Sequence, residues 1–266
     1  MRLIYGPVPL WRLGRSLGVD PVSAPSKTCS FNCIYCQLGR TRHPLTERQV
    51  FVQPSQLRQE LAEVGDVPID YVTFSGVAEP TLAANLAELV AVVRERFVQP
   101  VAILTNSSLM KQGDVRQDLA LFDVVVAKVD APDELLYQQI NRPFVNYTLA
   151  EILWGIRRFR EEFQGKLALQ MMFVETNRDR AEEMAEIAGD LSPDEVQLNT
   201  PLRPNPERPL SPEEMEEIEA AFAGLHVLSE VEGAVLNVYK AARPEVVFLD
   251  EEETRRRRPQ QKEERR

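Results

Sequence analysis

Three cysteines, Cys29, Cys33 and Cys36, fall within one short stretch and are the only cysteines in the chain. Iron–sulfur clusters are normally held by four cysteine thiolates. Three thiolates on one short loop can hold three irons of a four-iron cluster and leave the fourth iron open to a substrate or a cofactor. The spacing therefore predicts an iron–sulfur site that has a vacant coordination position.

Two other interpretations of the cysteines are open. His43 follows Cys36 closely, and three cysteines with one histidine form an accepted tetrahedral zinc set, so a zinc-stabilised binding module is an alternative. Zinc ligands usually come as two separated pairs rather than as one tight triplet. A disulfide framework is disfavoured because the number of cysteines is odd and the N-terminus has no secretory pattern.

The bulk properties favour a cytoplasmic enzyme. The length of 266 residues fits one large domain, or one domain with a small appendage. No apolar run approaches the roughly 20 residues that cross a bilayer, so no membrane partner is expected, and free thiols suit the cytoplasm. The formal net charge of -10 argues against a strongly basic surface for nucleic acid, although local patches are compatible with it.

The pattern of apolar residues predicts the architecture. From about residue 54, short β-rich runs alternate with amphipathic stretches, as in βα units around a parallel sheet. With one more strand before the cysteines, the chain has six such units, which predicts an α/β fold with a partial (β/α)6 barrel. The expected strands are 17–22, 69–75, 101–105, 124–130, 167–174 and 195–199.

The C-terminal quarter is expected to differ from the barrel core, which would span residues 1–206. A proline-rich segment, residues 200–209, which we call the strap, leads into a helix. The N-cap, first-turn proline and capping-box acid of this helix are Ser211, Pro212 and Glu214. Apolar runs near Val227 and beyond predict a small β-containing cap, so that 207–250 forms a C-terminal α+β extension. Residues 251–266 have no apolar side chain to bury and are expected to be a disordered charged tail.

Polar side chains follow several of the expected strands, at the end where parallel α/β folds bind ligands. Lys128 and Asp130 share one face of their strand, and a buried lysine needs an anionic partner, either Asp130 or a bound carboxylate. Asn106 and Asn199 could bond hydroxyl groups or form ordinary turns and caps. The amide of Gln170, midway along a strand, must find its partners in the core or in a ligand.

The turn that carries Gly76 and Glu79 lies between an expected strand and an expected helix. An acid there could meet a cationic group, or it could simply favour the N-terminus of the helix through the helix dipole. Ala78 resists a positive φ. We therefore expect either that the backbone at Ala78 stays in the ordinary region, or that the contact between this turn and the cationic group is altered.

The spacing Cys-x3-Cys-x2-Cys, with Tyr35 before Cys36, resembles the signature of the radical S-adenosylmethionine (radical SAM) superfamily. The resemblance implies a [4Fe–4S] cluster on Cys29, Cys33 and Cys36, with S-adenosylmethionine bound at the open iron. It also implies reductive cleavage of S-adenosylmethionine to a 5′-deoxyadenosyl radical that takes hydrogen from a substrate. An external one-electron donor of the ferredoxin or flavodoxin type would supply the electron.

The resemblance further implies a radical SAM-type partial barrel and a set of side chains that bind the cofactor. Tyr35 would flank the adenine, Glu79 would meet the methionine amino group, and Lys128 with Asp130 would meet the methionine carboxylate or the ribose. The cofactor-binding candidates are Tyr35, Gly76, Glu79, Asn106, Lys128, Asp130, Gln170 and Asn199.

Four further stretches, Tyr5 to Pro9, Arg12 to Asp20, Cys36 to Thr41 and Ile140 to Pro143, are similar to one branch of the superfamily. That branch contains bacterial and archaeal proteins related to the wyosine tRNA-base synthase, and the resemblance covers approximately residues 5–205. The synthase uses additional N-terminal cysteines that this chain does not have. Wyosine-type modification of a tRNA base is therefore an alternative function, and the substrate is left unassigned.

Overall fold

The computed structural model describes residues 2–10, 12–201, 203 and 205–229. The expected strands beyond residue 229 and the expected disordered tail, 251–266, lie outside the described residues. No helix of the described part is both long and apolar enough to cross a membrane.

One mostly parallel sheet organises the molecule. Its strand order is β1-β2-β5-β6-β7-β8-β9-β10, and every neighbouring pair is parallel except the antiparallel pair of β1 and β2. The strands are β1 (Ile4–Leu10), β2 (Gly14–Val19), β5 (Tyr71–Phe74), β6 (Val101–Thr105), β7 (Val124–Lys128), β8 (Lys166–Met172), β9 (Glu195–Asn199) and β10 (Val227–Ser229).

All six expected strands are present as the consecutive parallel strands β2 to β9, which confirms the α/β partial barrel. The bounds of β6 and β9 agree with the prediction to the residue. Within the described residues β1 and β10 do not pair with each other, so the barrel is open.

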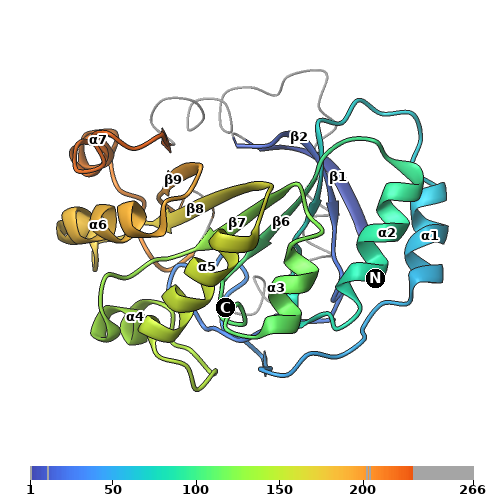
Figure 1. Ribbon diagram of the computed structural model, residues 1–266, viewed down its shortest axis with the longest axis horizontal. Helices are drawn as coiled ribbons and strands as arrows, with labels where there is room; N and C mark the ends of the chain where they lie inside the picture. Colours follow the sequence, from blue (N-terminus) through green and yellow to red (C-terminus); the bar gives the residue numbers. More distant parts are fainter. Residues whose placement is uncertain (1, 11, 202, 204, 230–266) are drawn as a thin grey trace.

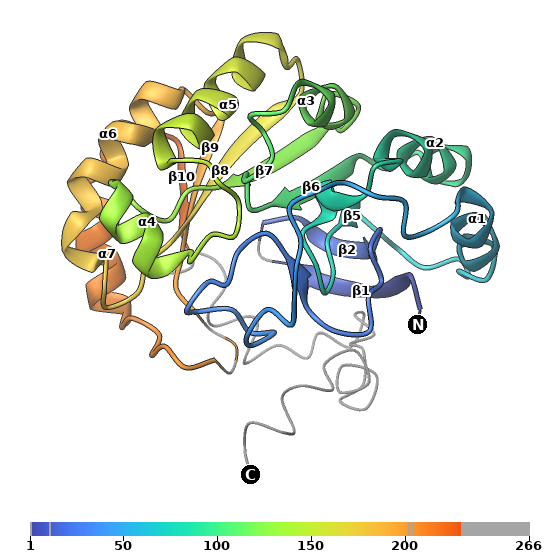
Figure 2. The same cartoon turned by 90° about the horizontal axis from the view of Figure 1, so that it is seen from below.

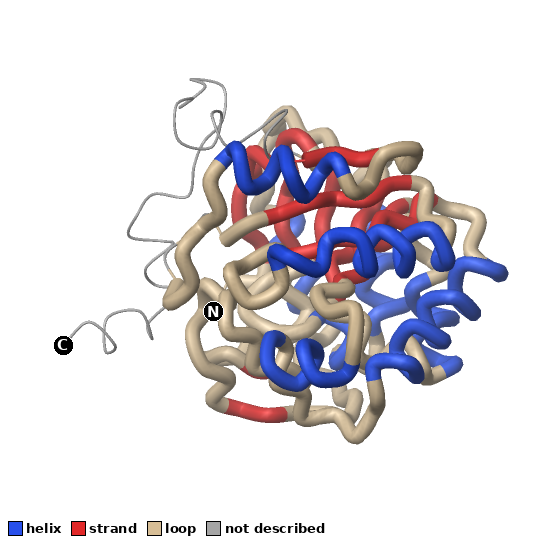
Figure 3. The backbone as a smooth tube through the Cα atoms, turned by 90° about the vertical axis from the view of Figure 1, so that its left-hand side faces the viewer, coloured by secondary structure: helices blue, strands red, loops and turns tan. Residues whose placement is uncertain are grey.

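Helices cover one face of this sheet. Figure 2 shows them as an outer arc, with the chain that follows β2 lying inside the arc, and Figure 3 shows the strands (red) beside the helices (blue) that cover them. The helical elements are α1 (Pro54–Ala62), η1 (Pro80–Leu82), α2 (Leu86–Arg96), α3 (Gly113–Leu119), α4 (Glu134–Ile140), α5 (Leu149–Glu162), η2 (Arg178–Arg180), α6 (Ala181–Leu191) and α7 (Pro212–Ala220).

The two faces of the sheet differ in character. On β8, Leu167, Leu169 and Met171 join the main apolar core beneath the helices, and the residues between them point to the opposite face. That opposite face carries a small apolar cluster, which includes Val126 and Ala168, as well as several polar side chains. A face with polar groups inside an open barrel is suited to binding a ligand.

The described part of the C-terminal extension packs on this core. Helix α7 begins as predicted, because Ser211 caps it and forms a capping box with Glu214. Phe222, just after α7, meets Phe173 edge to face at a ring distance of 6.2 Å. The run near Val227, which the sequence assigns to a β-containing cap without placing it, forms β10 and extends the main sheet by pairing with β9. The division between core and extension stays a prediction.

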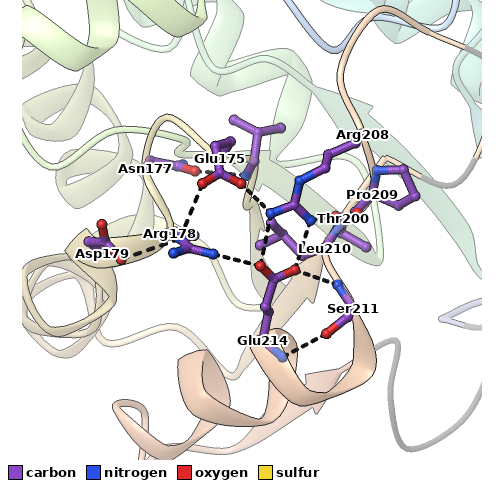
Figure 4. A network of polar contacts seen from close by, with 11 residues as sticks. Glu175, Asn177, Arg178, Asp179, Thr200, Arg208, Pro209, Leu210, Ser211 and Glu214 are labelled. Atoms are coloured by element: carbon purple, nitrogen blue, oxygen red, sulfur yellow. Dashed lines mark hydrogen bonds and ion pairs between the residues drawn. The ribbon is translucent and has the colours of Figure 1, made fainter.

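The strap before α7 is tied down by ion pairs (Figure 4). The guanidinium of Arg208 bonds both carboxylate oxygens of Glu214, at 2.8 and 2.9 Å, and also meets Glu175. Arg178 reaches the same Glu214 carboxylate at 2.6 Å. These contacts join the strap and α7 to the loop after β8 (Figure 1).

Candidate active site at the cysteine loop

The cysteine loop leaves the end of β2 and crosses the carboxyl ends of the parallel strands. It is held to the end of α4 by a backbone hydrogen bond of 2.9 Å from Ile34 N to Ile140 O. Within it, Cys36 N donates to Cys33 O and Gly39 N donates to Cys36 O, at 3.2 and 2.9 Å. The three thiols are free and half-buried, so the loop presents sulfur to the site on a fixed backbone.

Two asparagine amides point at the sulfurs. Asn106, after β6, donates from Nδ2 to Cys29 Sγ at 3.5 Å, and Asn141, after α4, donates from Nδ2 to Cys33 Sγ at 3.6 Å. The backbone N–H of Phe31 also donates to Cys29 Sγ, at 3.5 Å. Hydrogen bonds of this kind stabilise the negative charge of thiolate ligands and adjust the properties of the metal centre.

Lys27 places a positive charge beside the loop. It is only 4% exposed, and its Nζ donates to Gly39 O at 3.0 Å. Burial alone lowers the pKa of Lys27, but the nearby Cys36, Cys29 and Cys33 raise it by a larger amount in total. The pKa of Lys27 therefore lies above its ordinary value. The ammonium group therefore partly compensates the charge of three thiolates.

The thiols themselves require a cation to ionise. Burial raises the pKa of Cys29 to about 12, with a further contribution from Glu79, and raises the pKa of Cys33 to about 11, with a contribution from Asp130. A bound metal ion reverses this preference, because thiolates bind metals only after losing their protons. The donor set fits an iron–sulfur cluster, since each of the three thiolates could bind a different iron and the amides would stabilise the sulfurs.

The zinc alternative finds no support in the geometry. In the part of the chain that the structure describes, no three His, Cys, Asp or Glu side chains are grouped closely enough to hold a single metal ion. His43 is exposed on the short strand β4 (His43–Pro44), which pairs with β3 (Thr28–Cys29). The four ligands of one zinc ion must all lie about 2.0 to 2.3 Å from it, and this arrangement does not provide them.

Asp130 connects the cysteine loop to the sheet. Its carboxylate is buried after β7, and its Oδ2 accepts hydrogen bonds from the hydroxyl of Tyr35 and from Asn141 Nδ2 at 2.8 Å. Its Oδ1 accepts from Met172 N at 3.0 Å and lies 3.3 Å from Lys128 Nζ. A single carboxylate thus fixes the loop, the end of α4 and two neighbouring strands relative to one another.

A row of polar side chains continues from Asp130 across the inner face of the sheet. Lys128, Gln170 and Gln197 are register partners on β7, β8 and β9. Lys128 Nζ donates to Gln170 Oε1 at 3.4 Å, and Gln170 Nε2 donates to Gln197 Oε1 at 3.3 Å. The row ends where Gln197 Nε2 donates to Glu195 Oε1 at 2.6 Å.

Comparison with known proteins assigns the family. A family model described as "Radical SAM superfamily" matches residues 23–188, a range that contains the cysteine loop, Asp130 and Asn141. The chain belongs to the radical SAM superfamily. Radical SAM proteins are enzymes, and this chain is therefore one, with its reaction unspecified.

Relatives of similar length share this radical SAM sequence. A UPF0026 protein of Synechocystis sp. is 42% identical over 206 residues, which cover 76% of this chain and 77% of that protein. A UPF0026 protein of Methanocaldococcus jannaschii is 39% identical over 230 residues, covering 84% and 71% respectively. The chain is a member of the UPF0026 group. The link to the wyosine synthase stays a prediction.

Solved radical SAM structures share the fold. Streptococcus suis SuiB bound to precursor peptide SuiA superposes with a TM-score of 0.61 at 14% identity, over 77% of this chain and 47% of SuiB. A radical SAM methyltransferase from Sphaerobacter thermophilus gives 0.59 at 17% identity, over 80% and 65%. Native anSMEcpe with bound AdoMet gives 0.58 at 17% identity, over 80% and 63%. The chain thus spans between about half and two thirds of these enzymes.

The turn at Gly76 lies next to the cysteine loop. Gly76 has a φ of +142°, and a Cβ on it would collide with the carboxyl group of Asp20. That carboxyl group accepts a hydrogen bond from Val77 N at 3.1 Å. Ala78 keeps an ordinary φ and bridges Thr28 beside Cys29, in agreement with the first of the two expectations for this turn. Gly76 therefore allows a close approach of the backbone next to the cysteine loop.

Glu79 is buried and extensively bonded. It caps η1, and its Oε1 accepts from Thr81 Oγ1 at 2.7 Å and Thr105 Oγ1 at 2.6 Å, while its Oε2 accepts from Asn106 N at 2.7 Å. Burial raises its pKa, although these hydrogen bonds act in the opposite direction. Glu79 thus caps the short turn η1, while the helix that follows, α2, begins only at Leu86. Contact with the methionine amino group stays a prediction for Oε2, which accepts only one of the hydrogen bonds described.

Most of the remaining cofactor candidates already have hydrogen-bond partners within the protein, whereas one has a polar atom without a partner among the described residues. Tyr35 is 8% exposed with its hydroxyl bonded to Asp130, and Lys128 Nζ lies 5.0 Å from the centre of its ring. Asn106 bonds Ser30 Oγ at 2.9 Å as well as Cys29. By contrast, Asn199 is 5% exposed and its Oδ1 has no hydrogen-bond partner in the described part of the chain. Asn199 therefore offers a buried acceptor at the end of β9.

Proposed function

We propose that this chain is a radical SAM enzyme that holds a [4Fe–4S] cluster on Cys29, Cys33 and Cys36. The observation that supports this most directly is the pair of amides, from Asn106 and Asn141, that donate to the sulfurs of Cys29 and Cys33. The two asparagines come from distant parts of the chain, and both point to the same loop. An ordinary structural loop has no need of such donors.

When bound, the cluster supplies the electron that cleaves S-adenosylmethionine to a 5′-deoxyadenosyl radical, which takes hydrogen from a substrate. The protein groups hold and orient the reactants. Asp130 fixes the loop through Tyr35 and Asn141, and Lys27 compensates the negative charge of the sulfurs. The buried Oδ1 of Asn199 accepts a hydrogen bond from a hydroxyl group of the cofactor or of the substrate.

The electron comes from an external donor protein of the ferredoxin or flavodoxin type. The substrate is a small molecule, a peptide or protein side chain, or an RNA base. The fold likeness to SuiB, whose structure contains a precursor peptide, supports keeping peptides in this set, but at 14% identity it concerns the fold alone.

The test is anaerobic reconstitution with iron and sulfide, followed by iron quantitation and electron paramagnetic resonance of the reduced protein. We expect about four irons per chain and a signal that shifts when S-adenosylmethionine is added. The variant Cys33→Ala should lose the signal.

His43→Ala is the matched control, because His43 completes the zinc set but has no place in the cluster. Reconstituted His43→Ala should keep both the iron and the signal. Stoichiometric zinc in the purified protein that His43→Ala abolishes, with no iron signal in either form, would contradict the proposed function.

A further inference from the structure

Arginines without a partner gather at the cysteine loop. In the described part of the chain, nearly every arginine and lysine side chain has a hydrogen bond or an ion pair, so an unpaired cation there is unusual. The exceptions within the described residues, all exposed, are Arg40, Arg42, Arg142 and Arg157. Of these, only Arg157 is remote from the cysteines, on α5 in the outer arc of helices (Figure 2).

Arg40 lies in the loop itself, and backbone hydrogen bonds attach Arg42 and Arg142 to it. Gly39 N donates to Cys36 O at 2.9 Å, immediately before Arg40, and Arg42 N donates to Lys27 O at 3.1 Å. Asn32 N donates to Arg142 O at 3.1 Å. The three guanidinium groups therefore branch from the same short backbone that positions the sulfurs.

The charge of this region is opposite to that of the chain. Residues 27–50 contain Lys27, Arg40, Arg42 and Arg48 but only one acid, Glu47, which gives a net charge of +3 where the whole chain carries -10. Arg48 is neutralised by its ion pairs with aspartates of α3. The free positive charge is thus concentrated on the arginines around the sulfurs.

An exposed aromatic ring adjoins these arginines. Phe144 is 41% exposed, and its N–H donates to Ser30 O at 2.8 Å, within the cysteine loop. Arginine and aromatic residues are enriched where proteins bind one another. We name Arg40, Arg42, Arg142 and Phe144 together the basic collar.

We propose that the basic collar is the docking surface for an acidic one-electron carrier protein. The inference rests on the proposed function, because only a reducible cluster on this loop needs such a donor. In the step that docking serves, the carrier is oxidised by one electron and the cluster is reduced by one electron. No bond forms or breaks in this step.

The observations favour a protein over a nucleic acid as the occupant. The collar offers only three unpaired cations, whereas a nucleic-acid-binding surface typically neutralises about 6 to 10 phosphates. The rest of the chain is acidic and would repel an extended phosphate backbone. A compact acidic protein meets the collar alone, next to the loop that carries the cysteines.

The test measures electron transfer from a photoreduced flavodoxin of net negative charge to the reconstituted protein, followed by the flavin absorbance in an anaerobic stopped-flow instrument. The variants are Arg142→Glu and the triple variant Arg40→Glu, Arg42→Glu, Arg142→Glu. Arg157→Glu is the matched control, since it reverses an equally exposed and unpaired charge away from the loop. Dithionite reduction of each protein, followed by electron paramagnetic resonance, is the reference.

We expect the second-order rate constant of the triple variant to fall by about 10- to 1,000-fold at low ionic strength, which is the range of electrostatic steering. Arg142→Glu should fall between the triple variant and the wild type, and Arg157→Glu should match the wild type. Added salt should slow the wild type towards the triple variant, because it screens exposed charges. The signal after dithionite should be the same in all four proteins.

Equal flavodoxin rates in the triple variant and in Arg157→Glu, with normal signals after dithionite, would overturn the docking surface and leave the proposed function intact. Absence of any signal after dithionite, the wild type included, would instead overturn the proposed function. If the triple variant keeps the flavodoxin rate but loses salt-sensitive binding of total tRNA that Arg157→Glu retains, the collar is an RNA surface and the proposal is wrong.

Discussion

Asn141 links Cys33 to Asp130, because one amide group donates to both side chains, at 3.6 and 2.8 Å. The backbone carbonyls of Asn141 itself and of Arg142 accept the backbone N–H of Asn32, which holds the loop to the end of α4. A residue in this position acts on the sulfurs without binding iron itself. Its removal should therefore change the cluster more than it changes the fold.

The variant Asn141→Ala should retain iron less well, by about 10- to 100-fold in affinity, which is typical when a partner of a metal ligand is lost. The reduction potential of the cluster should also fall, because a donor to sulfur favours the reduced, more negative state. Iron loss to a chelator and a potentiometric titration measure the two effects. Asn146→Ala, at an exposed asparagine on the same loop, is the control, and identical results for the two variants would contradict the role.

The variant Tyr35→Phe tests the hydrogen bond that attaches the cysteine loop to Asp130, separately from the hydrogen bonds to the sulfurs. The hydroxyl of Tyr35 donates to the buried carboxylate of Asp130, and a hydrogen bond to a charged group contributes about 1.5 to 3 kcal/mol. We expect the free energy of unfolding to fall by about 2 kcal/mol, as measured by urea denaturation of the apoprotein. The reduction potential should change less than in Asn141→Ala, and the opposite ranking would show that the hydroxyl acts on the cluster directly.

Sequence reasoning found the residues whose types are chemically rare and did not assign a role to those whose types are common. Three clustered cysteines, and a lysine and an aspartate that end an apolar strand, are recognisable without coordinates. Asn141 was noticed only within a stretch of family resemblance, and the role of Lys27 was not foreseen. Asn141 meets Cys33 across 108 positions of sequence, and nothing local to either residue encodes that contact.

The element that depends most on charge is the strap with helix α7. Hydrogen bonds from Arg208 and from the backbone N–H of Ser211 lower the pKa of Glu214 to about 2, against an ordinary value of 4.5. A carboxyl group whose pKa is lower in the folded than in the unfolded state stabilises the fold fully above about pH 4.5. That contribution is lost as the pH falls towards 2.

Glu214→Gln should therefore lower the melting temperature at pH 7 and have a smaller effect at pH 3. Glutamine still completes the capping box, so the difference reports the charge rather than the cap. Scanning calorimetry of the wild type and of Glu214→Gln between pH 3 and pH 7 measures this difference in melting temperature. A difference in melting temperature that is the same at pH 7 and pH 3 would show that the ion pairs of Figure 4 do not stabilise the strap.

The turn at Gly76 is the element most sensitive to a single methyl group. Gly76→Ala adds a Cβ at a φ of +142°, directly against the Asp20 carboxyl group. Strain of this kind costs about 1 to 3 kcal/mol, and the displaced turn carries Ala78, which pairs with Thr28 beside Cys29. Urea denaturation and iron content should both show a loss. Gly189→Ala, where a Cβ meets nothing within 4 Å, is the control and should be neutral or slightly stabilising.

Among the elements, the strands of the parallel sheet were the most predictable, because strands buried on both faces appear as short apolar runs. Strand β1 was missed, since Gly6, Pro7 and Pro9 interrupt its sequence. Proline is tolerated there because, among the described strands, β1 lies at the edge of the sheet. A position at the edge of a sheet cannot be read from local composition.

At the scale of the whole molecule, the sheet grows beyond the six predicted units at both edges. Strand β1 is added next to β2, and β10 is added next to β9 from a segment that the sequence left unplaced within the C-terminal extension. A run of three strand residues, Val227–Ser229, does not indicate which sheet it joins. Its partner is determined by α7, whose packing returns the chain to the edge of β9.

This architecture predicts that the molecule responds differently to two truncations. Removal of residues 251–266 should leave the melting temperature unchanged, since that segment has no apolar side chain to contribute to a core. Removal of 226–266 should lower the melting temperature and promote aggregation, because it deletes β10 and exposes the buried strand β9 as an unpaired edge. Differential scanning fluorimetry and size-exclusion chromatography measure both effects. If the two truncated proteins melted at the same temperature, β10 would contribute nothing to the stability of the sheet.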